Sequence, residues 1–191
     1  MRGRSLHMFI AVAGAVATGL ALAAAPAAQS ANPQVNHFEF AFGFTWTDFC
    51  GTGADVEVSG AFRGTEFLAP NQPVDERVKL EGKTVYINPL NGKTVTLHIA
   101  ATTWSTTITG DPEGVHVVES TTKGLGASFR TEPGGVLIRD AGYITVRETY
   151  DGDEFVEGSR EIIVERGGHP ILAGGFFPVL CTVVPSALGL S

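Results

Sequence analysis

Alternating aromatic residues mark the clearest element of the chain, which we expect to be a β-strand. Aromatic side chains occupy every second position as Phe38, Phe40, Phe42, Phe44 and Trp46, with small or polar residues between them. A period of two places all five rings on one face of an extended strand, whereas a helix would spread them around its circumference. We predict that this face packs in the core, and a ligand-facing lining is the alternative.

Short β segments separated by turn residues follow along the chain. Val56, Val58 and Phe62 share one phase of the segment 55–67, which predicts a second strand with one apolar face. Pro70 begins a loop. Further strands are expected around a central hairpin and at 76–80, 83–88, 125–130, 135–140, 143–150, 155–157 and 160–166.

The central hairpin turns at the Asn-Gly pair of residues 91–92, and its register can be predicted. A three-residue loop pairs Val85 with Leu97 and Ile87 with Val95, which keeps one face apolar. Later in the same strand the apolar positions shift from odd to even numbers. We therefore expect a bulge near residues 100–103 that brings Trp104 into the inward phase.

About nine or ten short strands with regular turn signals predict an all-β domain. We expect an antiparallel up-and-down β-barrel of about 8–10 strands, with a β-sandwich as the alternative, and no long helix in the mature chain. The segment 171–190 carries no charge and could span a membrane by length. Pro178, Pro185 and the absence of flanking basic residues favour a barrel-closing strand that ends at Cys181.

The N-terminal segment has the pattern of a secretory signal peptide. Arg2 and Arg4 precede an uncharged run from Phe9 to Ala25, and small residues follow up to Ala31. We predict a cleaved signal helix at 1–31, with cleavage somewhere within 27–31, and a single all-β domain at 32–191. An uncleaved membrane anchor is the alternative. The protein is therefore expected to be secreted or attached to the cell envelope.

Charge and cysteine content narrow the range of partners. The chain has 13 basic and 20 acidic residues, and removing the two arginines of the signal leaves a net charge of −9. This balance argues against nucleic acid or anionic lipid as a partner. Cys50 and Cys181 form an even pair in an oxidising compartment, so we predict a disulfide between them and no metal site.

Several of these features together resemble a loosely defined family. Cys50 heads a segment that continues as Val-Glu-Val-Ser-Gly at 56–60, Asn-Gly-Lys-Thr-Val-Thr stands at 91–96, and Cys181 precedes an apolar tail. This pattern resembles small, mostly uncharacterised exported β proteins of actinobacterial type. The resemblance implies an exported β fold and no catalytic residues. Its outline is similar to lipocalin-like and allene-oxide-cyclase-like barrels, which says nothing about activity.

No motif for nucleophilic, nucleotide or zinc-protease chemistry occurs, so we assign no catalytic residue, metal ligand or cofactor. His37, His98, His116 and His169 are expected at the surface. The carboxylates of residues 151–157 fit a solvated hairpin tip better than a calcium loop.

An eight-stranded barrel can be filled by its own side chains or can hold one small ligand. The candidate cavity-lining residues are Phe44, Trp46, Tyr86, Trp104 and Tyr143. We expect a non-enzymatic barrel that binds a small apolar ligand or an envelope component. The alternatives are an interaction module that uses its threonine-rich outer sheet surface and, third, an isomerase- or cyclase-type enzyme.

Overall fold

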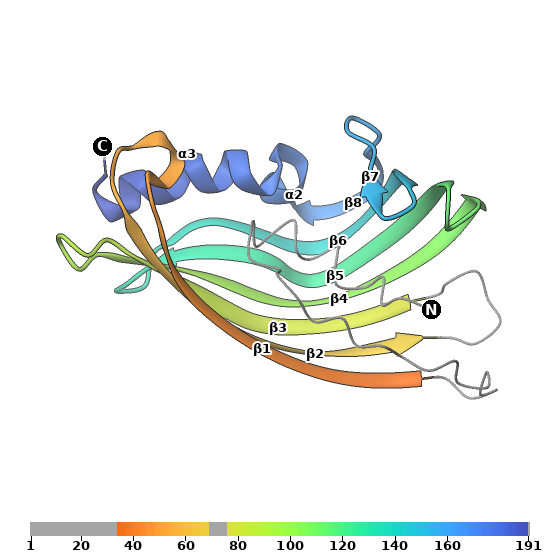
Figure 1. Ribbon diagram of the computed structural model, residues 1–191, viewed down its shortest axis with the longest axis horizontal. Helices are drawn as coiled ribbons and strands as arrows, with labels where there is room; N and C mark the ends of the chain where they lie inside the picture. Colours follow the sequence, from red (N-terminus) through yellow and green to blue (C-terminus); the bar gives the residue numbers. More distant parts are fainter. Residues whose placement is uncertain (1–33, 69–75, 191) are drawn as a thin grey trace.

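One antiparallel sheet of eight strands forms most of the molecule (Figure 1). The computed structural model describes residues 34–68 and 76–190, and the expected signal helix lies outside these ranges. The strands are β1 (Gln34–Trp46), β2 (Val56–Leu68), β3 (Glu76–Ile87), β4 (Thr94–Gly110), β5 (Val115–Thr131), β6 (Val136–Asp151), β7 (Glu154–Phe155) and β8 (Glu161–Gly168). A 3-10 turn, η2 (Phe49–Gly51), follows β1, and two helices, α2 (Pro170–Gly174) and α3 (Phe176–Leu188), follow β8.

The strands follow one another as an antiparallel meander. β1 to β6 pair in sequence order, and β7 and β8 both pair with β6 at different positions along it. Within the described residues nothing pairs β1 with β8. The prediction of an all-β antiparallel fold is therefore confirmed. The sheet is open, so the predicted closed barrel is not confirmed.

The sheet bows strongly, and both helices lie on its concave side (Figure 1). Residues that are paired across antiparallel strands point to the same face. The row Phe44–Val58–Tyr86–Val95 therefore lies on the concave face. Residues one position away along each strand, such as Glu57, lie on the convex face. The predicted phase of β1 and of Val56, Val58 and Phe62 in β2 is confirmed.

Helix α3 covers one end of the concave face and closes the hydrophobic core. Leu180, Val184 and Leu188 follow one another at intervals of four residues and are fully buried. They face the apolar positions of the first five strands, which include Val56, Val58, Tyr86, Val95, Leu97 and Phe129. Tyr86 lies between Phe49 and Phe129, with ring centroids 6.0 and 6.3 Å away.

The expectation of a strand ending at Cys181 is wrong, because this segment belongs to α3. Pro178 is in the first turn of the helix, where a backbone N–H needs no intrahelical partner, and Pro185 is in the last turn. Pro178 therefore fits the helix at no cost, whereas Pro185 removes one intrahelical hydrogen bond close to the end of the helix. None of the helices among the described residues is both long and apolar enough to cross a membrane.

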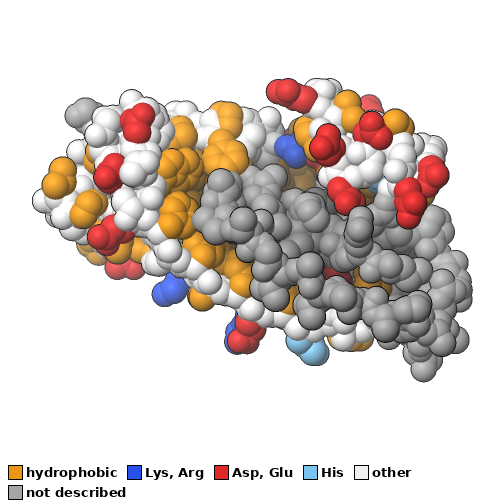
Figure 2. Space-filling model, in the orientation of Figure 1, with side chains coloured by type: hydrophobic (Ala, Val, Ile, Leu, Met, Phe, Trp, Pro, Cys, Tyr) orange, Lys and Arg blue, Asp and Glu red, His pale blue; other side chains and the backbone are white. Residues whose placement is uncertain are grey.

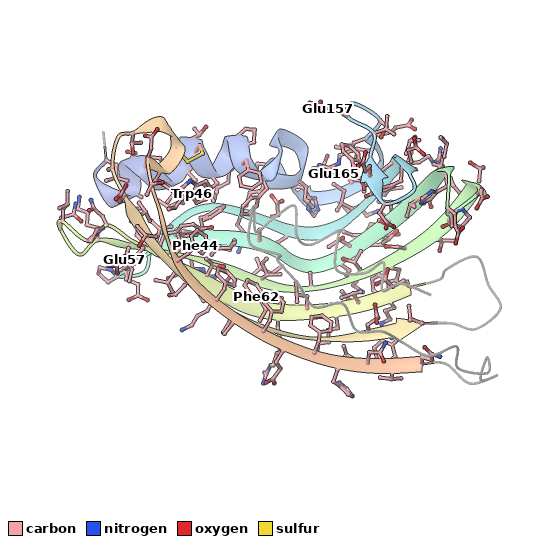
Figure 3. The ribbon with its side chains drawn as sticks, viewed as in Figure 1. Phe44, Trp46, Glu57, Phe62, Glu157 and Glu165 are labelled. Atoms are coloured by element: carbon pink, nitrogen blue, oxygen red, sulfur yellow. A yellow bond between two sulfur atoms is a disulfide. The ribbon has the colours of Figure 1, made fainter. Side chains whose placement is uncertain are left out.

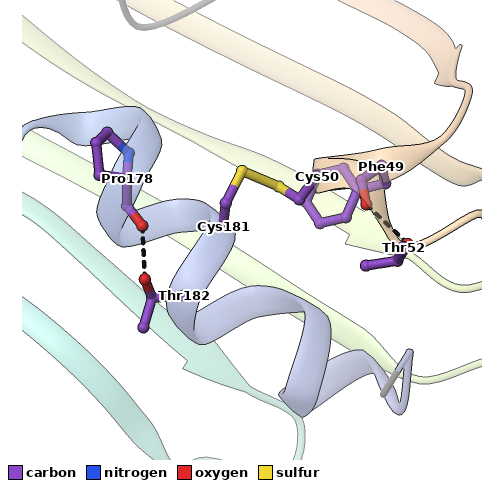
Figure 4. The surroundings of a disulfide bond; sticks show 6 residues. All are labelled: Phe49, Cys50, Thr52, Pro178, Cys181 and Thr182. Atoms are coloured by element: carbon purple, nitrogen blue, oxygen red, sulfur yellow. Dashed lines mark hydrogen bonds between the residues drawn. A yellow bond between two sulfur atoms is a disulfide. The ribbon is translucent and has the colours of Figure 1, made fainter.

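The predicted disulfide is confirmed and joins Cys50 in η2 to Cys181 in α3 (Figure 4). On the η2 side the Thr52 hydroxyl donates to the Phe49 carbonyl at 2.7 Å. On the helix side Thr182 donates to the Pro178 carbonyl, also at 2.7 Å. The bond thus links the end of the edge strand β1 to the helix that covers the core, and not to a last strand.

The register of the central hairpin differs from the prediction. Tyr86 pairs with Val95, so Tyr86 and not Val85 faces the core. The reason is a longer turn, in which the backbone N–H of Asn88 donates to the Lys93 carbonyl at 3.0 Å. The side chains of Asn88 and Asn91 both donate to the Leu188 carbonyl at the end of α3, at 3.0 Å each. The helix therefore holds the turn in a register that shifts β3 by one residue.

A row of glycines crosses the sheet where β5, β6 and β8 meet. Gly124 pairs with Gly142, and Gly142 pairs with Gly167. All three have positive φ angles, and a Cβ atom at Gly142 would lie 2.1 Å from the Arg166 carbonyl oxygen. Only glycine allows this close approach, and such positions bend a sheet.

Candidate ligand-binding face

Six aromatic rings lie together on the concave side of the open sheet edge. We call this set the aromatic face: Phe38, Phe40, Phe42, Phe44 and Trp46 of β1 and Phe62 of β2. Figure 3 places Phe44, Trp46 and Phe62 on the helix side of the sheet and Glu57 on the other side. In Figure 2 hydrophobic side chains form a band beside the part of the surface that is not described.

The four phenylalanines of β1 form a ladder of nearly parallel rings. Successive ring centroids from Phe38 to Phe44 are 6.1–6.5 Å apart, with interplanar angles of 17–28°. Phe62 extends the ladder onto β2, where its ring lies 5.3 Å from that of Phe40. These are offset-stacked distances, so the rings present a continuous apolar surface.

Glycines on the neighbouring strands let these rings lie across the sheet. A Cβ atom at Gly60 would lie 2.5 Å from the Phe42 ring, and one at Gly64 would lie 2.3 Å from the Phe38 ring. The Phe62 ring lies over Gly82 of β3, where a Cβ atom would be 2.5 Å from the ring. At Gly60 and Gly64, therefore, β2 has no side chain that would occupy the place of the Phe42 and Phe38 rings.

The aromatic face is partly open to solvent. The Phe40 side chain is 43% exposed, and Phe38, Phe42, Phe44 and Trp46 are half-buried. At one end Trp46 contacts the buried Phe49 edge-to-face at 5.0 Å, so the aromatic face continues directly into the core. The prediction that these rings pack in the core therefore holds at this end and not at Phe40.

The concave face becomes polar with distance from α3. The Thr103 and Thr122 hydroxyls lie 3.0 Å apart, and so do those of Ser105 and Ser120. At the far end of this face the Glu148 carboxylate is buried. It accepts hydrogen bonds from Arg160 Nε at 2.6 Å and from the Tyr150 hydroxyl at 3.0 Å.

Two histidines are buried, which the sequence did not predict, and Tyr150 beside one of them is half-buried. The ring of His116 stacks on Tyr150 with a centroid distance of 5.7 Å, and His169 is also buried. The expectation of surface histidines is therefore wrong for these two. Burial, followed by the neighbouring Glu148 carboxylate, raises the pKa of Tyr150.

Asp140 attaches the helical segment to the sheet. Its fully buried carboxylate accepts the backbone N–H groups of Ile171 and Leu172 at 2.8 Å each. Burial raises the pKa of Asp140, and these two hydrogen bonds act in the opposite direction. The geometry satisfies the first turn of α2 and leaves no oxygen of Asp140 directed at a ligand.

The predicted cavity residues are not brought together. Phe44 and Trp46 belong to the aromatic face, and Tyr86 is enclosed in the core beneath α3. Trp104 and Tyr143 lie on the convex face, because β4 keeps its phase through residues 99–105 and shows no inward shift at Trp104. The open surface at Phe40 was missed because alternation identifies a face and not what covers it.

A shallow hollow of about 670 Å³ is bordered by residues of β1–β4. Its border includes Phe40 and Phe62 on the concave face but also Glu39 and Arg63 on the convex face. It is therefore not one enclosed site, and the aromatic face is the better candidate. Among residues 34–68 and 76–190, no three His, Cys, Asp or Glu side chains gather as a metal site.

No protein-family model, no curated protein and no solved structure matches this chain.

Proposed function

We propose that this chain is an exported, non-enzymatic binding protein that holds a small, flat apolar ligand on the aromatic face. The observation that supports this most directly is the partly exposed ladder of stacked rings at the open edge of the sheet, with Phe40 at its centre. A folded domain gains stability by burying such rings, so leaving them in contact with solvent indicates a surface that a ligand covers.

The shape of the aromatic face favours a ligand with ring systems. The rings of Phe38, Phe42 and Phe62 lie over glycines, which leaves a low, broad surface to stack against. Each added aromatic stacking contact contributes about 0.5–1.5 kcal/mol beyond the burial of apolar area. A ligand that covers two or three rings would therefore be retained without any ion pair.

Export fits the same proposal. The Cys50–Cys181 disulfide is compatible with an extracellular protein, because such bonds persist in oxidising compartments. It also attaches α3 to the end of β1, and this contact sets the closed end of the aromatic face.

The test combines native mass spectrometry with a titration of the mature protein. Protein from an exporting host should carry a mass excess that disappears on denaturation. For the titration we choose the neutral dye N-phenyl-1-naphthylamine and the variant Trp104→Phe, in which Trp46 is the remaining tryptophan. We expect saturable binding that changes the fluorescence of Trp46.

A matched pair of variants separates this site from general surface hydrophobicity. Phe40→Ala should weaken dye binding about tenfold, which corresponds to about 1.4 kcal/mol. Phe155→Ala on β7 removes an equally exposed ring, 43% in both cases, and should have no effect. Equal losses in both variants, or binding that does not saturate, would contradict the proposed function.

A further inference from the structure

The convex face carries most of the positive charge of this acidic protein. Eleven basic residues follow residue 31, and nine of them lie on the convex face. The other two are Lys93, in a turn, and Arg160, at the far end of the concave face. The strands place seven carboxylates on the same face, namely Glu39, Glu57, Glu81, Glu119, Asp151, Glu154 and Glu161. The convex face is thus net positive although the mature chain has a net charge of −9.

Two adjacent rows of cross-strand neighbours on this face contain no carboxylate. One runs from His37 on β1 to Arg166 on β8, and the other from Val35 on β1 to Val164 on β8; every residue of both rows is described. We call them the basic band, and the residues that characterise it are Arg77, Lys79, Trp104, Lys123, Tyr143 and Arg166.

The rows on either side of the basic band each contain two carboxylates and one arginine, and the arginine pairs with carboxylates of its own row. Arg63 forms an ion pair with Glu81 on one side. Arg147 lies 3.0 Å from Glu119 and 3.9 Å from Glu161 on the other. The ion pairs of the described residues do not involve Lys79, Lys123 or Arg166. All three side chains are exposed, so an external partner can reach their charges.

Exposed aromatic rings alternate with the cations. Tyr143 stands between Lys123 and Arg166, and its side chain is 37% exposed. Trp104 is 38% exposed, and the Arg77 guanidinium lies 5.7 Å from its ring centroid. Threonines occupy many of the positions between them. Exposed rings stack against the apolar faces of sugar rings, and hydroxyl groups exchange hydrogen bonds with sugar hydroxyls.

The spacing of the cations selects among anionic partners. In the row that ends at Arg166, the cations Lys79, Lys123 and Arg166 stand on β3, β5 and β8, with one strand between successive members. Neighbouring strands are about 4.8 Å apart, so these charges recur about every 10 Å. One strand spacing is close to the length of one monosaccharide in a linear chain.

From this match we propose that the basic band binds a linear acidic polysaccharide with one negative charge per disaccharide, lying across the strands. Each second sugar would place its acid beside Lys79, Lys123 or Arg166, and the sugars between would meet Trp104, Tyr143 or threonine hydroxyls. Nucleic acid fits less well, because its phosphates are more closely spaced and carboxylates border the basic band on both sides.

Calorimetric titration of the mature wild-type protein tests this directly, with three probes at low ionic strength. The probes are a hyaluronan oligosaccharide (one carboxylate per disaccharide), a polygalacturonate oligosaccharide (one per sugar) and oligo-dT. We expect hyaluronan to bind most tightly, and we expect its affinity to fall as salt is added. Tighter binding of oligo-dT or polygalacturonate, or no binding of hyaluronan, would overturn the proposal.

Variants with the same change of charge provide the control. Lys79→Gln combined with Lys123→Gln should weaken hyaluronan binding at least tenfold. Lys83→Gln combined with Lys93→Gln removes two lysines outside the basic band and should change it less than twofold. Equal effects of the two pairs would show a nonspecific charge effect and overturn the proposal. In the variant Trp46→Phe, the remaining Trp104 reports this face, so failure here is distinct from failure at the aromatic face.

Discussion

Loss of the Cys50–Cys181 disulfide should remove a large part of the stability of this domain. The two cysteines are separated by 131 residues, so the bond closes a loop that spans almost the whole sheet. In the chain-entropy relation a loop of this length contributes about 5 kcal/mol at 25 °C, by restricting the unfolded chain. Losses measured on removing native disulfides are about 2–5 kcal/mol, and we expect the upper half of that range here.

The location of the bond adds a structural reason. It joins η2 to α3, and α3 buries Leu180, Val184 and Leu188 against the sheet. Without the bond, the helical segment remains attached through Asp140, which binds the first turn of α2, and through the turn asparagines, which bind the end of α3. We therefore expect a weakened native state with the same fold, not a chain that lacks the helix.

The assay is urea unfolding of the oxidised wild type, the reduced wild type and the double variant Cys50→Ser, Cys181→Ser. The unfolding curves of the two forms without the bond should coincide. Their free energy of unfolding should be about 3–5 kcal/mol lower than that of the oxidised protein. A loss below about 1 kcal/mol, with the denaturant slope unchanged, would refute the reasoning from loop length.

Three further changes follow from the structure. Phe129→Ala removes a fully buried ring that contacts Tyr86 and should cost about 3–5 kcal/mol of unfolding free energy in urea. Burial raises the pKa of Tyr86, so the folded state favours its neutral phenol. The resulting contribution to the free energy of unfolding is fully present below the unfolded pKa of about 10 and is lost as the pH rises above that value. Tyr86→Phe should therefore lose less stability than the wild type in melts above about pH 10, and parallel losses would contradict the assignment. Gly142→Ala places a Cβ atom 2.1 Å from a β8 carbonyl oxygen and should lower the melting temperature by several degrees, whereas Gly114→Ala, with its nearest contact at 3.9 Å, should leave it nearly unchanged.

Local pattern was sufficient for the features that depend on one strand or one pair of residues. The period of two in β1 identified its aromatic face, because alternate side chains of any extended strand point the same way. The pairing of Cys50 with Cys181 followed from there being two cysteines in a chain that we expected to be exported. The solvated hairpin tip after Tyr150 likewise needed only turn residues and charge.

Features that depend on distant partners were decided by the tertiary structure. The side chains of Asn88 and Asn91 donate to the end of α3, and that contact set a hairpin register that apolar pairing alone misassigned. The helix α3 was missed because its two prolines were weighed as helix breakers, whereas burial of Leu180 against the sheet outweighs the hydrogen bond lost at Pro185.

The two proposed binding surfaces show the same division between sequence and structure. Strand β1 supplies five rings of the aromatic face from consecutive alternate positions, so the sequence by itself determined that this face exists. What remains exposed on it was decided by where α3 ends and by glycines on β2 that lie under the rings. The basic band was not visible in the sequence, since its residues come from β3 to β8 and are separated by other charges along the chain. Only cross-strand register places them side by side, and register is a property of the whole sheet.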